Sequence, residues 1–217
     1  MKNEIKWEGK EKDTGRTLYK GINCQQNPNV FKVFTQFFNK VHFDYVIEIG
    51  TSYGGFSLFL HEQSSKHNFK FITYDWFDFK GGNWNNRTEP LKNKIGRIPF
   101  DMRNKNVFED LTIKEISKIL SNNKCLLLCD GGDKIKEFNI YSNYLSVGSY
   151  IMAHDYAPNI KYYKNKIESK RWKWFEIQDS DIKDAMEKNN IVKTIPQEDF
   201  NKVVWVQCKK KRLYNGK

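Results

Sequence analysis

Short apolar runs alternate along the chain with amphipathic segments, which is the pattern of an α/β protein with a mainly parallel sheet. The runs that predict strands lie at residues 45–49, 69–75, 104–110, 125–129, 149–153, 175–177 and 203–208. The segments with helical spacing of apolar residues lie at 28–40, 55–64, 111–120, 135–145 and 179–188. The run at 125–129 contains no charged residue, as expected for a strand that is covered on both faces. Cys125 and Cys129 are therefore predicted to fill strand positions.

A glycine-rich turn follows the first of the long strands. Gly50, Gly54 and Gly55 surround Thr51 and Ser52 between the strand at 45–49 and the helix start. Glycines allow a sharp turn and the close approach of a ligand, and the first turn of a helix offers free N–H groups. The turn is therefore predicted to bind a ligand, and the alternative is a tight strand–helix turn without one.

Glu48 is an acid near the end of this predicted buried strand. A buried carboxylate is costly unless it is paired, and a ligand with a positive charge or hydroxyls would pair it. A phosphate-binding loop fits worse, because Phe56 and Ser57 follow Gly55 where Lys and Ser or Thr are needed. The dinucleotide fingerprint also fits worse, because Ser52 stands at its second glycine.

Asp75 ends the next predicted strand. Its distance from Gly50 is close to the roughly 20 residues at which an acid binds ribose hydroxyls in such folds. An ionised carboxylate can accept hydrogen bonds from both hydroxyls. Asp78 is a competing candidate, and the alternative for Asp75 is a solvated acid at a strand end.

The Glu48-x-Gly50-x-x-x-Gly54 pattern resembles the first motif of the class I S-adenosylmethionine (SAM)-dependent methyltransferases. Gly55 followed by Phe56 and Ser57 resembles the sugar and small-molecule O-methyltransferase branch, which includes cephalosporin-hydroxylase-like proteins. The resemblance implies a Rossmann-like, seven-stranded, mostly parallel sheet with helices on both faces and an antiparallel last strand. It implies SAM as cofactor and methyl transfer to a hydroxyl of a sugar, glycan or small metabolite. The cofactor residues that it implies are Glu48, Gly50, Thr51, Ser52, Gly54, Gly55, Asp75, Asn106 and Asp130, with Glu109 competing with Asn106 for the adenine.

A second cluster follows the strands at 125–129 and 149–153, where Asp130, Lys134, His154 and Asp155 stand. Carboxyl ends of parallel strands share one sheet edge, so these side chains are expected near the glycine turn. Asp130, His154 and Asp155 offer oxygen ligands and one nitrogen, which suits Mg²⁺ or Mn²⁺.

The same positions resemble the metal site of the metal-dependent O-methyltransferases, although the pair here is His-Asp. Lys134 resembles the lysine base of their catechol-type members, one position later than expected. Without a metal, His154 is the natural base. The alternative is purely structural: Asp130 pairs with Lys134, and His154 pairs with Asp155.

Residues 1–27 are predicted to be an N-terminal arm, held by Trp7, Leu18, Tyr19 and Ile22, and residues 28–208 the methyltransferase domain. Residues 76–104 mix aromatics, glycines and arginines and are predicted to be a lid or substrate loop. Residues 161–173 are basic and aromatic, which fits a polyanion or glycan contact or a surface helix. Residues 209–217 form a basic tail.

The net charge of +11 is carried mostly by lysine and permits a nucleic-acid partner. An RNA-modifying methyltransferase and a non-catalytic SAM-binding protein therefore stay as alternatives, but no RNA-binding module is recognisable. The favoured partner is a small molecule or glycan, and a homo-oligomer stays open. No apolar run approaches the ~20 residues of a membrane span, and the cysteines form no paired CxxC motif. A cytoplasmic protein without a membrane partner is expected.

Overall fold

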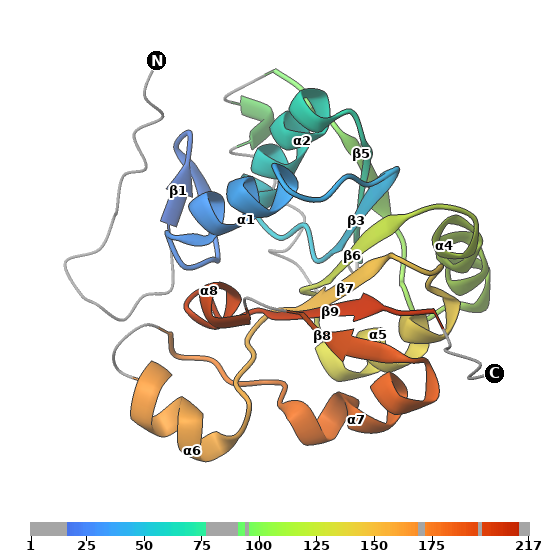
Figure 1. Cartoon of the computed structure of the whole chain (residues 1–217). Coiled ribbons are helices and arrows are strands. Elements are labelled where there is room, and N and C mark those ends of the chain that lie inside the picture. The colour runs from blue at the N-terminus through green and yellow to red at the C-terminus, as the bar shows by residue number, and fades with distance from the viewer. Residues whose placement is uncertain (1–16, 77–90, 94–95, 169–171, 195–196, 213–217) are drawn as a thin grey trace.

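Seven strands form the central sheet in the order β5-β4-β3-β6-β7-β9-β8 (Figure 1). The computed structural model describes residues 17–76, 91–93, 96–168, 172–194 and 197–212. The strands of this sheet are β3 (Tyr45–Ile49), β4 (Lys70–Asp75), β5 (Asp101–Asn104), β6 (Cys125–Cys129), β7 (Tyr150–Ala153), β8 (Ile191–Lys193) and β9 (Val206–Lys210).

The pairing of these strands confirms the predicted topology. β5, β4, β3, β6 and β7 pair in parallel, and β9 is inserted antiparallel between β7 and β8. All five residues of β6 are fully buried at the middle of the sheet, and its two cysteines are free thiols in strand positions. Both faces of β6 are covered, which is why its sequence is a continuous apolar run.

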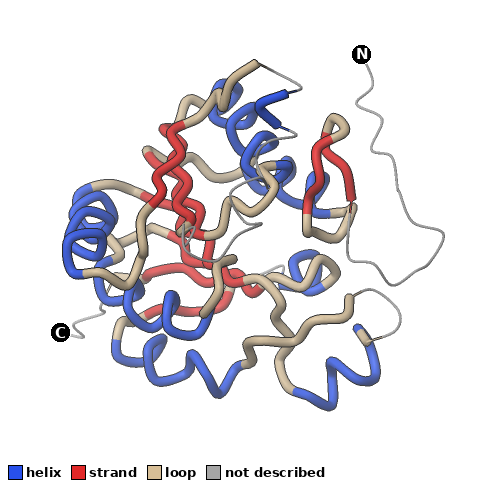
Figure 2. Tube along the Cα trace, turned by 180° about the vertical axis from the view of Figure 1, so that it is seen from behind, coloured by secondary structure: helices blue, strands red, loops and turns tan. Residues whose placement is uncertain are grey.

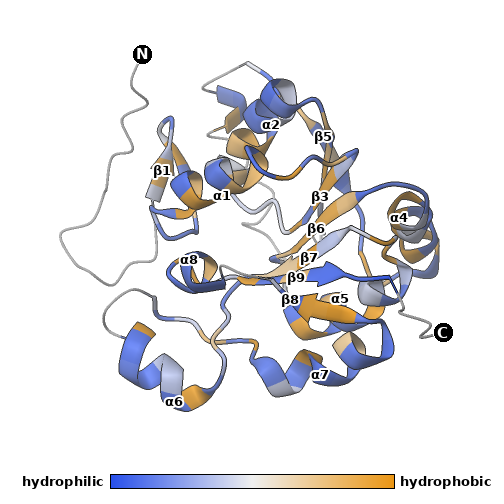
Figure 3. Cartoon of the chain, viewed as in Figure 1, coloured by the Kyte–Doolittle hydropathy of each residue, from blue (hydrophilic) through white to orange (hydrophobic). Residues whose placement is uncertain are grey.

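Helices cover both faces of the sheet (Figure 2). The described helices are α1 (Val30–Phe38), α2 (Gly55–His67), α4 (Asp110–Asn122), α5 (Lys134–Tyr141), the 3₁₀ turn η1 (Ser142–Tyr144), α6 (Ile160–Tyr162), the π-helical turn η2 (Tyr163–Ile167), α7 (Asp179–Lys188) and α8 (Gln197–Asn201). One hydrophobic core joins α1, α2 and α8 to the sheet, and a second joins α4, α5 and α7 to the opposite face. Hydrophobic and hydrophilic residues are mixed along α1, α2 and α4 (Figure 3), and the first half of α2, residues 55–60, is buried on all sides.

The phenylalanines of α1 have the core role that their spacing predicts. Phe34 is fully buried and meets Phe56, Phe200 and Trp205 edge to face. Burying a side chain of this size stabilises the fold by roughly 1.5–3 kcal/mol. The core on this face is therefore mainly aromatic.

The segment before α1 is packed onto the fold as a hairpin of β1 (Thr17–Tyr19) and β2 (Ile22–Cys24). Tyr19 and Ile22 are buried in the core beside α1 and α2, as predicted, and the Tyr19 hydroxyl donates to Glu62 at 2.9 Å. Leu18 is only partly buried, and Trp7 lies outside the described residues.

Two predicted strands were wrong in position. The strand expected at 104–110 is β5 at 101–104, because the Asn106 side chain accepts the Phe108 N–H at 3.0 Å and turns the chain towards α4. Residues 101–104 therefore belong to the sheet, whereas residues 77–90 and 94–95 of the predicted lid lie outside the described residues. The strand expected at 175–177 makes only one bridge, between Tyr156 and Ile177. The sixth strand is β8, which follows α7 instead of preceding it.

The last strand begins later than predicted. Val203, Val204 and Trp205 are buried, but Val204 has a φ of +57° and the sheet pairing starts only at Val206. β9 then extends through Lys210, so Lys209 and Lys210 of the predicted tail are strand residues. Among the described residues, no helix has the length and apolarity needed to cross a membrane.

Candidate active site

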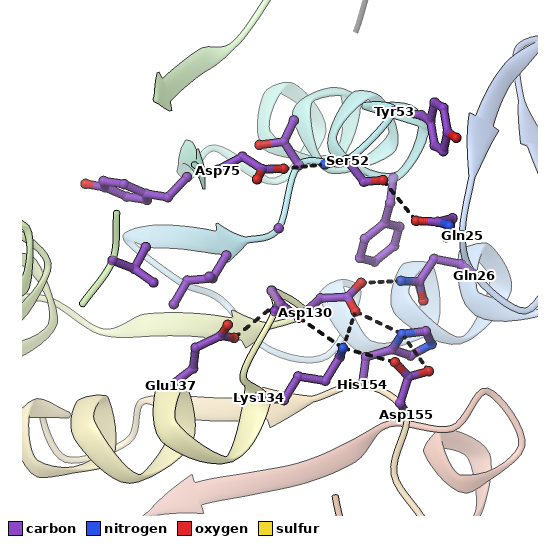
Figure 4. Close-up of a pocket in the computed structure, with 18 of the residues that line it drawn as sticks. Gln25, Gln26, Ser52, Tyr53, Asp75, Asp130, Lys134, Glu137, His154 and Asp155 are labelled. Carbon is purple, nitrogen blue, oxygen red and sulfur yellow. Dashed lines mark hydrogen bonds and ion pairs between the residues drawn. The ribbon is translucent and has the colours of Figure 1, made fainter. Parts of the chain in front are cut away.

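A cavity of about 680 Å³ opens at the carboxyl ends of β3, β4, β6 and β7 (Figure 4). This is the sheet edge where open α/β folds bind ligands. Nearly every residue that the sequence pointed to lines it: Gly50, Thr51, Ser52, Gly54, Gly55, Asp75, Asn106, Asp130, Lys134, His154 and Asp155. The glycine turn and the Asp-Lys-His-Asp cluster therefore belong to one site.

Gly50 lets the turns after β3 and β6 touch. Its φ is +99°, and a Cβ at this position would lie 2.2 Å from the carbonyl oxygen of Asp130. Gly55 is as tightly placed, because its Cβ would lie 2.3 Å from the carbonyl oxygen of Asn23. Glycine is required at both positions, and the result is a bare backbone floor under one end of the cavity.

Asp75 lies beside this floor and orders the turn. Its carboxylate accepts the backbone N–H of Ser52 at 2.7 Å and that of Trp76 at 2.8 Å. Ser52 adopts a φ of +48° and donates its hydroxyl to Gln25 at 2.9 Å. The two hydrogen bonds to Asp75 hold the start of the turn against the end of β4.

Glu48 was expected to contact the cofactor, but its side chain lies below the cavity surface. It is only 1 % exposed and is not among the residues that line the cavity. Its carboxyl accepts hydrogen bonds from Ser57 at 2.5 Å and from Thr73 at 2.7 Å. Burial raises the pKa of Glu48 to about 8, against the effect of these hydrogen bonds. Protein hydroxyls, not a ligand, therefore meet the polar demand of this acid.

The other end of the cavity holds the predicted cluster. His154 Nδ1 lies 2.9 Å from Asp130 Oδ1 and 3.5 Å from Asp155 Oδ1. Lys134 Nζ lies 3.0 Å from Asp155 Oδ2 and 3.9 Å from Asp130 Oδ1 (Figure 4). A fifth member, Glu176, pairs with Lys134 Nζ at 2.7 Å. The Lys134 ammonium and the His154 imidazole thus lie among three carboxylates.

His154 is enclosed more fully than a base that contacts substrate directly would be. Its ring is 1 % exposed and packs against Trp205 and Trp172, with ring centres 4.9 and 5.1 Å away. Its Nε2 is buried and has no hydrogen-bond partner among the described residues. Burial alone would lower the pKa of His154, but Asp130 and Asp155 outweigh burial and raise it. The cavity-facing member of the pair is Asp130, whose side chain is 15 % exposed.

Comparison with known proteins decides the family. Residues 12–189 match the family model described as Rhamnosyl O-methyltransferase/CmcI. The chain belongs to this family. It is a SAM-dependent O-methyltransferase, and the predicted resemblance is confirmed. A search of curated protein sequences finds no match.

Solved structures show the same fold as this O-methyltransferase. An apo structure of CmcI is 8 % identical, covers 90 % of this chain and 76 % of its own, and has a TM-score of 0.60. A CmcI structure titled with Mg and SAM is 10 % identical over the same shares, with a TM-score of 0.57. The SAH-bound methyltransferase PaMTH1 of Podospora anserina is 14 % identical, covers 83 % of this chain and 76 % of its own, and has a TM-score of 0.51.

Several residues of the methyltransferase cavity were not foreseen from the sequence. Gln26 donates to Asp130 Oδ2 at 2.5 Å and accepts from Trp205 Nε1 at 2.9 Å. Trp172 donates its indole N–H to Asp155 Oδ1. Glu137 accepts the N–H of Gly131 at 3.2 Å, and burial raises its pKa to about 7. Of these residues, only Trp172 could have been suspected from the sequence, because it lies in the basic and aromatic stretch at 161–173.

Three residues of the cavity offer ligand atoms for a divalent metal. Ligand atoms of Asp130, His154 and Asp155 lie within 4.8 Å of one another, so they form a candidate metal site within the described residues. Each carboxylate oxygen of this set already faces a protein donor from Gln26, His154, Trp172 or Lys134. Each of these oxygens keeps a second lone pair, but an ion bound to them would also lie beside the Lys134 ammonium, which is 3.0 Å from Asp155 Oδ2. In this arrangement the residues do not fit a metal ion.

Proposed function

We propose that this enzyme transfers the methyl group of SAM to a hydroxyl oxygen of a sugar, glycan or small metabolite. The observation that carries the proposal is the single cavity, with a glycine floor and Asp75 at one end and Asp130 with His154 at the other. Its volume of about 680 Å³ lies within the roughly 300–1,000 Å³ of small-ligand sites. The family description, which names a rhamnosyl O-methyltransferase, supports a sugar hydroxyl as acceptor.

The cofactor end follows from the chemistry of its residues. Gly50, Gly54 and Gly55, with Thr51 and Ser52, would hold the methionine part of SAM against bare backbone. The Asp75 carboxylate would accept the ribose hydroxyls, and Asn106, which lines the same end, would meet the adenine. A carboxylate that pairs with a diol fixes the orientation of the ligand as well as its position.

The reaction also requires a group that removes the proton of the acceptor hydroxyl. SAM, when bound, supplies a methyl group on a positively charged sulfur, which leaves as a neutral thioether. The attacking oxygen becomes positively charged as its bond to carbon forms, so its proton becomes strongly acidic. The carboxylate of Asp130 lies at the cavity surface and accepts this proton, and His154 Nδ1 stabilises Asp130 from behind at 2.9 Å. His154 is then a positioning residue, because its ring is enclosed by tryptophans.

The cavity rim favours a ring-shaped acceptor. Trp174 is 39 % exposed and lines the cavity beside Glu176, at the Asp130 end. Aromatic faces offer large apolar contact area at little entropic cost, which suits the apolar face of a sugar or an aromatic metabolite. Metal assistance at Asp130, His154 and Asp155 is the alternative form of the proposal, and the occupied ligand atoms argue against it.

The experiment is transfer of labelled methyl from SAM to a panel of acceptors: rhamnose-containing glycans, simple sugars, phenolic metabolites and RNA. The wild type is compared with Asp130→Asn and with Asp133→Asn, a matched change in the same loop at a residue that does not line the cavity. Loss of acid–base help typically costs about 10²–10⁴-fold in rate. We expect label on a hydroxyl acceptor, a loss of at least about 100-fold in Asp130→Asn, and near wild-type rates in Asp133→Asn. Label on RNA alone, or full activity of Asp130→Asn, would refute the proposal.

A further inference from the structure

The ammonium of Lys134 occupies the centre of an acidic cluster that consists of Asp130, Asp155 and Glu176. Nζ lies 2.7 Å from Glu176, 3.0 Å from Asp155 and 3.9 Å from Asp130. It also donates to the carbonyl oxygen of Gly131 at 3.1 Å. The side chain is 6 % exposed, so the cation is held inside the site and does not move freely in solvent.

The three nearest oxygens satisfy the ammonium completely. Lysine has three N–H donors, and Glu176, Asp155 and the Gly131 carbonyl supply three acceptors within hydrogen-bond distance. Lysine can act as a base only after it loses a proton, and these three acceptors stabilise its protonated form. Lys134 is therefore not placed as the base that its resemblance to catechol-type enzymes suggested.

The atoms that a metal would need are engaged by the same network. Asp155 Oδ2 faces Lys134, and Asp155 Oδ1 accepts from Trp172. Asp130 Oδ2 accepts from Gln26, and Asp130 Oδ1 faces His154 Nδ1. A divalent ion typically lies about 2.0–2.6 Å from its oxygen ligands. Such an ion would have to break these contacts and lie close to a buried positive charge.

We propose that Lys134 is the built-in cation of this site and takes the place of a divalent metal, so that O-methyl transfer by this enzyme is independent of metal ions. The ammonium neutralises part of the charge of the acidic cluster and fixes Asp155 and Glu176 at the acceptor end of the cavity. The inference deepens the proposed function and rests on it for the reaction that the site performs.

The test is direct binding of Mn²⁺, measured by electron paramagnetic resonance of the free ion. The proteins are the wild type, Asp155→Asn, Lys134→Met, Lys134→Met with Asp155→Asn, and Lys136→Met. Methionine keeps most of the length of lysine and removes the charge together with the three N–H donors. Lys136 lies on the same helix but does not line the cavity, so its substitution is the matched control.

We expect the wild type and Lys136→Met to leave Mn²⁺ free up to about 1 mM, which is far weaker than dedicated carboxylate sites. Lys134→Met is expected to bind Mn²⁺ at least about 10-fold more tightly, a gain of about 1.4 kcal/mol. Adding Asp155→Asn should abolish that gain. Mn²⁺ binding by the wild type that Asp155→Asn removes would overturn the proposal, and so would a folded Lys134→Met with no gain.

The wild-type measurement stays informative even if Lys134→Met fails to fold. Methyl transfer by the wild type after treatment with EDTA gives a second readout, and unchanged activity is expected. Activity that EDTA abolishes and Mg²⁺ restores would contradict the inference but leave the proposed function intact. Absence of methyl transfer under every condition would contradict the proposed function, while Mn²⁺ resonance would still report on Lys134.

Discussion

Gln26 donates a hydrogen bond of 2.5 Å to Asp130, a residue 104 positions later in the chain. The same side-chain amide accepts the indole N–H of Trp205 at 2.9 Å. One buried glutamine therefore connects the segment after β2, the end of β6 and the segment before β9. The orientation of Asp130 in the cavity depends on a residue from the predicted N-terminal arm.

Gln26→Ala is expected to lower kcat by roughly 10-fold, because Asp130 loses one of the donors that orient it and a buried hydrogen bond to a charged group contributes about 1.5–3 kcal/mol. SAM affinity, measured by calorimetry, should stay within about 3-fold, a difference of less than 1 kcal/mol. Gln63→Ala removes another buried amide, on α2, that does not line the cavity, and is the control. Equal losses of kcat in both variants would show that Gln26 acts only through general stability.

Gly50→Ala tests the contact between the turns after β3 and β6. The new methyl would lie 2.2 Å from the Asp130 carbonyl oxygen at a φ of +99°. Strain of this kind and overpacking each cost about 1–3 kcal/mol, so we expect a loss of roughly 2 kcal/mol or more in urea unfolding. Gly132→Ala, in the neighbouring turn with open space around the new methyl, should change stability little. Equal stability of the two variants would contradict this packing.

Glu48→Gln tests the buried acid under the turn. Burial raises the pKa of Glu48 to about 8 in the folded protein, against 4.5 ordinarily. Between these values the folded state holds a proton that the unfolded chain releases, so stability falls as pH rises from about 4.5 to about 8. The thermal midpoint of the wild type should therefore fall more steeply over this range than that of Glu48→Gln. The exposed Glu187→Gln should follow the wild type, and parallel curves for all three proteins would contradict the prediction.

Trp76 and Trp174 test the two ends of the cavity. Trp76 follows Asp75 and is 57 % exposed, whereas Trp174 lies beside Trp172 at the opposite end. Aromatic stacking on a ligand ring contributes about 1–3 kcal/mol, or roughly 5- to 150-fold in affinity. Trp76→Ala should weaken SAM binding, and Trp174→Ala should raise the KM for the acceptor. The opposite pattern, or one effect common to both variants, would show that the two ends are assigned wrongly.

Most of the sheet could be predicted because its strands carry strong local signals. The runs at 45–49 and 125–129 are apolar and end at polar or glycine residues, and both match β3 and β6 to the residue. β8 was missed because it has three residues, of which only Ile191 is buried. Its pairing with β9 is a tertiary effect that no local pattern records.

The sequence predicted those site residues that directly follow a strand of the sheet. Asp75, Asp130, His154 and Asp155 line one cavity because parallel strands place their carboxyl ends at one edge. Gln26 and Glu176 join them from loops distant in sequence, and their position depends on packing alone. Glu48 was assigned to the cofactor because its partners, Ser57 and Thr73, lie on other elements. The oligomeric state stays a prediction.

The central claim is that this cavity binds SAM through Asp75. The most direct measurement is calorimetric titration of SAM and of its demethylated product into the wild type, Asp75→Ala and the exposed Asp184→Ala. Each charge-assisted hydrogen bond to the ligand contributes about 1.5–3 kcal/mol, so Asp75→Ala should lose at least about 10-fold in affinity for both ligands. Asp184→Ala should bind as the wild type does. Unchanged binding in a folded Asp75→Ala, or no binding of either ligand by the wild type, would contradict the account.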